Sequence, residues 1–109
     1  MALPAGGELW WADLDEAGAR PVVVVSRDAA IAGRRRALVA PCSTVIRGLP
    51  SEVLLEPGEE PVDRLCAAQA DSLTDLPVVV LTRRLGRVSD HAMRQLCTAL
   101  NVAAGCTGA

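Results

Sequence analysis

The sequence predicts a small, mainly β barrel with one amphipathic helix packed against it. The chain has 109 residues, which is enough for one domain and too few for a second independent core. Short apolar runs separated by glycine and proline indicate a series of short strands, and only the last part of the chain shows a helical apolar period. We therefore expect residues 1–109 to form a single domain of five or six strands and a terminal helix.

Aromatic and β-branched residues predict the first three strands. Residues 8–14 (ELWWADL) contain both tryptophans, and residues 21–26 (PVVVVS) carry a valine run that is typical of a strand buried on both faces. Residues 37–43 (ALVAPCS) form the third expected strand. Pro41 lies near its end, where a missing N–H is tolerated.

The second half of the chain contains shorter strands. We expect strands at residues 51–55 (SEVLL) and 64–69 (RLCAAQ). Valine content also predicts a strand over residues 78–81 (VVVL), which follow Pro77. The expected connections are a turn at 15–19, a loop or single helical turn at 27–33, and an acidic turn at 56–61 (EPGEEP).

The terminal helix has the clearest pattern in the chain. Ser89 is a favourable N-cap, and the acidic Asp90 suits the first helical turn. The i, i+3, i+4, i+7 spacing of one apolar helix face is occupied by Met93, Leu96, Cys97 and Leu100. Gly105 ends the pattern. The spacing predicts a helix between Ser89 and Gly105 with Cys97 on its buried face.

Charge is distributed unevenly along the chain. All 11 basic residues are arginines, and 13 acids leave a net charge of -2 at pH 7. Residues 20–48 carry a net charge of +5, residues 52–63 carry -5, and residues 83–94 carry +3. The acidic total argues against a protein that coats polyanions indiscriminately, whereas the segregation permits a local basic face. Ordinary solvated surface charge would produce the same pattern.

We expect no targeting or membrane-spanning segment. The apolar run at residues 21–25 is far shorter than the roughly 20 residues of a membrane span. Residues 1–4 lack the basic and then apolar pattern of a signal peptide. The sequence therefore favours a cytoplasmic protein with reduced thiols.

The cysteines and the single histidine do not have the spacing of a metal site. No CxxC pair occurs among Cys42, Cys66, Cys97 and Cys106, and His91 is the only histidine. We therefore expect neither a metal nor a cofactor. Cys42 and Cys66 lie in apolar, strand-like segments, which favours a role as small buried residues. His91 is expected at the surface near the start of the helix.

The remaining residue types favour chemistry on a phosphate group. The P-loop and the GxGxxG fingerprint are both missing from the sequence. The lack of Tyr and Phe excludes an aromatic RNA-stacking platform of the RRM kind, and one histidine excludes a two-histidine nuclease. Arginines, hydroxyls and carboxylates can nevertheless bind a phosphate and stabilise charge that develops on it.

A candidate phosphate site involves the second and third strands. Arg20 precedes Pro21 at the start of the valine strand, where the fixed backbone restrains the guanidinium. Ser43 and Thr44 end the third strand, and Arg47 follows them. If the two strands are neighbours, these groups converge on one phosphate-sized position. In the structural alternative, Arg20 pairs with a strand carboxylate and the hydroxyls serve only a turn.

The order of the motifs resembles the MazF/PemK (Kid)-type toxins. The matching segments lie at 7–14 (GELWWADL), 20–28 (RPVVVVSRD), 40–44 (APCST), 47–53 (RGLPSEV) and 85–88 (LGRV). Their order and spacing together are fairly specific, and they extend over nearly the whole chain. Within that family the sequence is most similar to the short, arginine-rich actinobacterial type.

The resemblance implies a dimeric SH3-like barrel that acts as a sequence-specific endoribonuclease without a metal. In that family the RNA 2′-hydroxyl attacks the adjacent phosphate and leaves a 2′,3′-cyclic phosphate and a 5′-hydroxyl, which inhibits translation and growth. The catalytic positions map onto Arg20, Ser43 and Thr44, with Ser43 standing where the family usually has threonine. The implied RNA contacts are Trp11, Arg27, Arg47, Gln69 and Ser72.

The proton transfers are less well defined by the resemblance. Arginine stays protonated in proteins, so Arg20 is expected to stabilise the phosphorane charge and to be able to donate a proton to the leaving 5′-oxygen. Water and Glu16 are both candidates to accept the 2′-hydroxyl proton. Two departures from the family affect the RNA-binding edge. The turn at 15–19 is short, and Asp71 stands where relatives often carry a base.

The resemblance also implies the partners. They are single-stranded RNA, a second copy of the chain, and an antitoxin whose acidic and hydrophobic segment folds into a basic groove between the protomers. One alternative is a non-catalytic CcdB-like toxin directed at gyrase, although residues 105–109 lack the terminal Trp-Gly-Ile of that family. Another is a degenerate member that binds RNA or an antitoxin without turnover.

Overall fold

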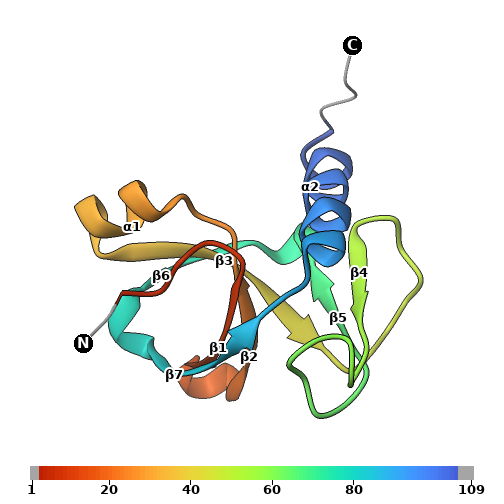
Figure 1. Ribbon diagram of the computed structural model, residues 1–109, viewed down its shortest axis with the longest axis horizontal. Helices are drawn as coiled ribbons and strands as arrows, with labels where there is room; N and C mark the ends of the chain where they lie inside the picture. The colour runs from red at the N-terminus through yellow and green to blue at the C-terminus, as the bar shows by residue number, and fades with distance from the viewer. Residues whose placement is uncertain (1–2, 106–109) are drawn as a thin grey trace.

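The computed structural model describes residues 3–105, apart from the side chain of Ala17. Within this part of the chain, seven strands alternate with short helical segments and end in one long helix (Figure 1). The strands are β1 (Glu8–Asp13), β2 (Ala19–Val24), β3 (Arg36–Ser43), β4 (Glu52–Leu55), β5 (Cys66–Gln69), β6 (Thr74–Pro77) and β7 (Leu81–Arg87). The helices are η1 (Asp15–Ala17), α1 (Asp28–Arg34), η2 (Ala70–Ser72), η3 (Val78–Val80) and α2 (Asp90–Ala104).

All seven strands belong to one antiparallel sheet. The strand order is β4-β5-β3-β2-β1-β7, and β6 pairs with the first half of β3. The long strand β3 joins the two parts of the sheet, because it pairs with β6 and β2 along most of its length and with β5 at its end. Among the described residues no pairing closes the sheet into a ring. The predicted mainly β, barrel-like fold with a terminal helix is confirmed.

Two hydrophobic cores lie on opposite faces of β2. Val23 contributes to the core between the sheet and α2, whereas Val22 and Val24 contribute to the core inside the barrel. All three valines are buried, which confirms the prediction of a strand covered on both faces. The core between the sheet and α2, called the outer core below, also contains Leu9, Ala40, Val53, Leu55 and Leu96. The core inside the barrel, called the inner core below, also contains Trp10, Ile31, Val39, Val78 and Leu81.

Helix α2 begins and ends where the sequence predicts. The Ser89 hydroxyl accepts a hydrogen bond from the Ala92 N–H at 3.0 Å, and Gly105 ends the helix in the left-handed conformation. The prediction that Cys97 lies on the buried face is wrong, because Cys97 is exposed. The face that packs on the sheet is centred on Ala92, Leu96 and Ala99, so small alanines define it instead. None of the described helices is both long and apolar enough to cross a membrane.

Three further parts of the chain differ from what the sequence predicts. Residues 78–81 do not form a strand: η3 occupies Val78–Val80, and β7 begins at Leu81. The expected loop or single helical turn is the longer helix α1, which places Ile31 in the barrel core. The sequence also failed to predict β6, which pairs with β3 from Arg36↔Pro77 to Val39↔Thr74.

Candidate active site

The pairing of β2 with β3 brings the candidate catalytic residues together. The two strands are antiparallel neighbours with Val22 opposite Pro41. Two residues further along, the same register places Arg20 level with Ser43. On the other side of β2, Trp11 of β1 lies opposite Pro21. The condition set by the sequence, that the second and third strands be neighbours, is therefore met.

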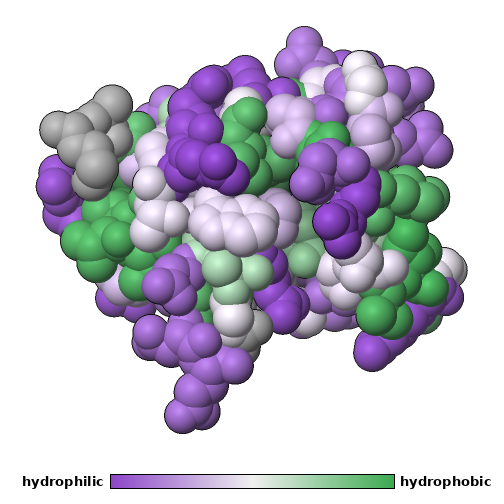
Figure 2. Space-filling model, turned by 90° about the horizontal axis from the view of Figure 1, so that it is seen from below, coloured by the Kyte–Doolittle hydropathy of each residue, from purple (hydrophilic) through white to green (hydrophobic). Residues whose placement is uncertain are grey.

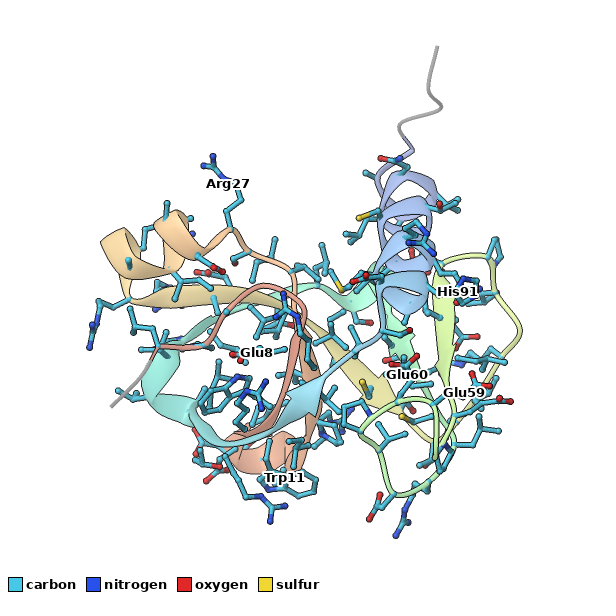
Figure 3. All side chains as sticks on the ribbon, viewed as in Figure 1. Glu8, Trp11, Arg27, Glu59, Glu60 and His91 are labelled. Carbon is cyan, nitrogen blue, oxygen red and sulfur yellow. The ribbon has the colours of Figure 1, made fainter. Side chains whose placement is uncertain are left out.

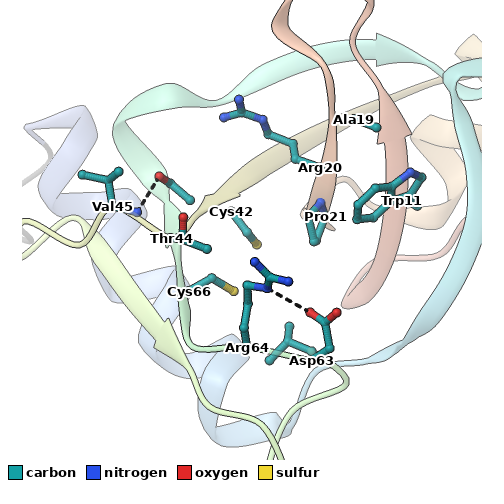
Figure 4. Close-up of a pocket in the computed structure, with 12 residues that line it drawn as sticks. Trp11, Ala19, Arg20, Pro21, Cys42, Thr44, Val45, Asp63, Arg64 and Cys66 are labelled. Carbon is teal, nitrogen blue, oxygen red and sulfur yellow. Dashed lines mark hydrogen bonds and ion pairs between the residues drawn. The ribbon is translucent and has the colours of Figure 1, made fainter.

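These residues line a pocket of about 500 Å³ at the start of β2 and the end of β3 (Figure 4). Strands β1, β2, β3 and β5 supply part of its wall, and the loop after β3 and the loop of residues 56–65 between β4 and β5 supply the rest. The lining residues are Trp11, Ala19, Arg20, Pro21, Cys42, Ser43, Thr44, Val45, Val62, Asp63, Arg64 and Cys66. The face that carries η1 and this loop is mostly hydrophilic, with apolar patches at its sides (Figures 1 and 2).

Arg20, Ser43 and Thr44 present hydrogen-bond donors to this pocket. Arg20 is half-buried at the start of β2, and Thr44 is exposed beyond the end of β3. The Ser43 hydroxyl accepts a hydrogen bond from the Val45 N–H at 3.1 Å, which leaves its own O–H to donate into the pocket. One guanidinium and two hydroxyls can therefore bind the oxygens of a phosphate group.

Two thiols face each other in the wall of the pocket (Figure 4). Cys42 and Cys66 are both buried, as the sequence predicts. The hydrogen bond with Cys66, together with burial, raises the pKa of the Cys42 thiol well above its ordinary value, while the charge of Arg20 acts in the opposite direction. The same hydrogen bond lowers the pKa of the Cys66 thiol, against burial and the negative charge of Asp63. Charges from two sides of the pocket thus act on this pair.

The sequence failed to identify Asp63 and Arg64 as residues of the pocket. Both come from the loop between β4 and β5, and the Arg64 Nε lies 3.7 Å from the Asp63 Oδ1. Both side chains are largely exposed. The only sequence signal is an adjacent acid and base just before the Cys66 strand, and that signal does not say where the loop folds.

Four of the predicted RNA contacts lie outside the pocket. Arg27 caps α1 and extends from the side of the molecule opposite Trp11 (Figure 3). The Arg47 N–H donates to the Glu52 carboxylate at 3.1 Å in the loop after β3. Gln69 ends β5, and Ser72 ends η2.

Three other residues singled out from the sequence also lie away from the pocket lining. Glu16 belongs to the exposed turn η1, and His91 is exposed on α2, as expected. Asp71 accepts a hydrogen bond from the buried hydroxyl of Ser51, so it fastens η2 to the start of β4. Among the described residues, no group of three or more His, Cys, Asp or Glu side chains could hold a metal ion.

The fold and the pocket together define a small barrel-like protein with an anion-binding site built from arginine and hydroxyl groups. A family model described as the PemK-like, MazF-like toxin of type II toxin-antitoxin systems matches residues 5–103. The chain is also 59% identical over 106 residues to the probable endoribonuclease MazF5 of Mycobacterium tuberculosis, covering 97% of each chain. The chain therefore belongs to the PemK-like, MazF-like toxin family.

Solved structures agree with this assignment. An endoribonuclease in complex with its cognate antitoxin, from a mycobacterial species, superposes with a TM-score of 0.86 at 27% identity and covers 97% of this chain and 99% of its own. The Mycobacterium tuberculosis toxin MazF-mt6 superposes with a TM-score of 0.82 at 26% identity, covering 90% of this chain and 96% of its own.

Proposed function

We propose that this protein is the toxin of a type II toxin–antitoxin pair and that it cleaves single-stranded RNA as a sequence-specific endoribonuclease. The observation that carries the proposal is the convergence of Arg20, Ser43 and Thr44, from two neighbouring strands, on one pocket. Membership of the toxin family and the endoribonuclease names of its relatives support it. They favour this function over a gyrase-directed toxin.

In the proposed reaction the pocket holds the phosphate at the cleaved bond. The RNA 2′-oxygen attacks phosphorus, the bond to the 5′-oxygen breaks, and the products end in a 2′,3′-cyclic phosphate and a 5′-hydroxyl. Arg20 stabilises the charge that develops on the pentacoordinate phosphorus, and Ser43 and Thr44 donate hydrogen bonds to the same group. A permanently charged guanidinium suits this role because its charge does not depend on pH near neutrality.

Further RNA contacts are proposed beyond those of Arg20, Ser43 and Thr44. Trp11 lines the pocket, and the Arg83 guanidinium lies 6.0 Å from the centre of its ring. A base next to the cleaved bond can stack on such an indole. Contacts from Arg27, Arg47, Gln69 and Ser72 require RNA that continues beyond the pocket.

We also propose a second copy of the chain and an antitoxin as partners. The loop after β3 exposes the apolar side chains of Val45, which lines the pocket, and Leu49; they are 62% and 44% exposed. Arg47 lies between them in the sequence. An antitoxin segment with alternating acidic and apolar residues would cover this surface and block access to the pocket. Such a pair would act in the cytoplasm, where the RNA is.

The proposal predicts that the purified protein cleaves long single-stranded RNA in the presence of EDTA. Arg20→Ala should lower the cleavage rate at least about 100-fold, because it removes the main group that stabilises the phosphorane. Arg94→Ala, on the exposed side of α2, removes an equal charge away from the pocket and should leave the rate unchanged. The products should carry 2′,3′-cyclic phosphate and 5′-hydroxyl ends when their termini are sequenced.

Three results would contradict the proposal. RNA that stays intact across many sequences would exclude the nuclease. Gyrase-dependent DNA breaks with RNA untouched would support the alternative toxin. RNA binding without turnover would indicate a degenerate member of the family.

A further inference from the structure

The pocket contains a carboxylate for which the reaction has an evident use. Asp63 is the one acidic side chain among the described residues that line the pocket. It lies on the loop wall, across from the strand wall that carries Arg20 (Figure 4). Its side chain is 90% exposed, so it can contact both a bound RNA strand and solvent water.

The loop that carries Asp63 is anchored immediately before it. The Glu60 carboxylate accepts two hydrogen bonds from Ser89, one from its N–H at 2.7 Å and one from its hydroxyl at 2.6 Å. Glu60 lies beside the start of α2, and Glu59 lies farther from it (Figure 3). Val62 packs against the outer core, and Cys66 starts β5 in register with Leu55. Asp63 is therefore held between two fixed points.

Pro61 adds a contact that depends on a glycine. It packs against Gly86 of β7 so closely that a Cβ at Gly86 would lie 2.6 Å from the Pro61 Cβ. Gly86 also has a φ of 153°, which L side chains rarely adopt. The close approach therefore requires glycine, and it holds the loop at the edge of the pocket.

Two arginines and two cysteines share the pocket with Asp63. Arg20 lines the pocket from β2, Arg64 follows Asp63 on the same loop, and Cys42 and Cys66 line it from β3 and β5. The Arg64 Nε lies 3.7 Å from the Asp63 Oδ1 and leaves the carboxylate exposed. Because Asp63 lines the same pocket as both arginines, a phosphate bound by these guanidinium groups would bring its attached ribose into the pocket that Asp63 lines.

We propose that Asp63 is the general base of the cleavage reaction, an assignment that rests on the proposed ribonuclease function. The Asp63 carboxylate takes the proton of the RNA 2′-hydroxyl while the 2′-oxygen forms its bond to phosphorus. The bond between phosphorus and the 5′-oxygen breaks, and this oxygen leaves with a proton from a water molecule. Asp63 returns its proton to water, so the number of protons is conserved.

Asp63 fits this role better than Glu16, the acid that the sequence alone offered. Glu16 lies in the short turn η1 and does not line the pocket. Asp63 shares the pocket with both Arg20 and Ser43. A base must come within hydrogen-bonding distance of the hydroxyl it deprotonates, and among the described acids only Asp63 shares a wall of the phosphate pocket.

Single-turnover cleavage of an RNA oligonucleotide by Asp63→Asn tests the assignment. The cleavage rate should fall about 100-fold or more, because the amide cannot accept the proton. Affinity for the same oligonucleotide with a 2′-deoxy substitution at the cleaved position should not weaken, because the variant only removes a negative charge near an anion. The wild-type rate should rise with pH in the acidic range, and this rise should disappear in Asp63→Asn.

Glu59→Gln is the matched control, since it removes the same charge from the same loop outside the pocket and should keep the wild-type rate. Asp63→Glu keeps the carboxylate and should recover part of the rate, and thermal melting shows that each variant is folded. If the wild type cleaves RNA and Asp63→Asn matches its rate and pH profile, or if Glu16→Gln loses the rise instead, the assignment of Asp63 is overturned. If the wild type leaves RNA intact, the proposed function itself fails.

Discussion

Arg64 shows how a single exposed side chain alters the electrostatics of the pocket. With Arg20 it gives the pocket two guanidinium groups on opposite walls, although the chain as a whole carries a net charge of -2. Asp63 offsets part of the positive charge at 3.7 Å, but an exposed pair at this distance is weak. The pocket therefore remains attractive to a phosphate.

Arg64→Ala should weaken RNA binding more than it slows the chemical step. Removing one cation near a phosphate should lower the slope of log affinity against log salt concentration by about 0.7 for a single strand. Fluorescence anisotropy with a 2′-deoxy oligonucleotide at several salt concentrations measures this slope. An unchanged slope would mean that Arg64 does not touch the RNA, and Arg94→Ala supplies the comparison at equal charge.

The sequence predicted three of the strand residues that line the pocket, Trp11, Arg20 and Ser43. Arg20 and Ser43 each adjoin a segment with a strong β signature in the sequence. If these two strands pair, as β2 and β3 do, the two side chains are expected to lie close together. Asp63 and Arg64 could not be found this way. Their position depends on contacts of Glu60 with Ser89 and of Pro61 with Gly86, which join residues more than 20 positions apart.

At the scale of elements, one acidic side chain connects the loop of residues 56–65 to helix α2. Glu60 accepts hydrogen bonds at the N-cap of α2, where a negative charge also interacts favourably with the helix dipole. The loop and the start of the helix therefore stabilise each other. The pocket depends on the helix through this connection, although no residue of α2 lines it.

Glu60→Ala should therefore affect both stability and activity. Losing the two hydrogen bonds at the helix start should cost about 1–2 kcal/mol of unfolding free energy. The loop should also loosen, so the cleavage rate should fall while the RNA-binding surface on the strands persists. Chemical denaturation and cleavage assays measure the two effects. Glu59→Ala should change neither, and a variant as stable and active as the wild type would contradict this connection.

The elements that the sequence mispredicted depend on tertiary contacts. Strand β6 (Thr74–Pro77) has few β-forming residues, and its pairing with β3 is reinforced by Asp75, which accepts a hydrogen bond from the Arg36 Nε at 2.6 Å. This hydrogen bond lowers the pKa of Asp75. The valines of η3 favour a strand by composition, yet Val79 is 73% exposed and only Val78 enters the core. Amino-acid composition alone therefore cannot tell that residues 74–77 form a strand and residues 78–80 do not.

At the scale of the whole molecule, Glu8 joins the first strand to the last. Its carboxylate accepts hydrogen bonds from the Ala5 N–H at 2.7 Å, the Trp10 indole N–H at 3.1 Å and the Arg84 Nε at 2.6 Å. Burial alone would raise the pKa of Glu8, but these hydrogen bonds and the charge of Arg84 outweigh it, so the pKa is lowered. The charged form therefore stabilises the fold.

This shift predicts how stability depends on pH. A carboxyl group with a lowered pKa in the folded state stabilises the protein above its unfolded pKa, and this stabilisation is lost as the pH falls through the folded pKa. Glu8→Gln should cost about 1–3 kcal/mol near neutral pH. The gap between the melting temperatures of variant and wild type should narrow as the pH is lowered from about 7 to about 3. A gap that stays constant over this range would show that the Glu8 charge contributes nothing.

The two cores on opposite faces of β2 have a further consequence for how the protein tolerates change. Val23 belongs to the outer core, and Val22 and Val24 belong to the inner core. Neither core can therefore come apart without exposing one face of the strand that the two cores share. Arg20 and Pro21 continue the same strand into the pocket. A substitution that loosens only the outer core or only the inner core therefore leaves the other core intact. The intact core still supports the strand that carries the Arg20 guanidinium. In the loop that carries Asp63, Val62 packs against the outer core. Substitutions in that core can therefore shift this side of the pocket while Arg20 keeps its position.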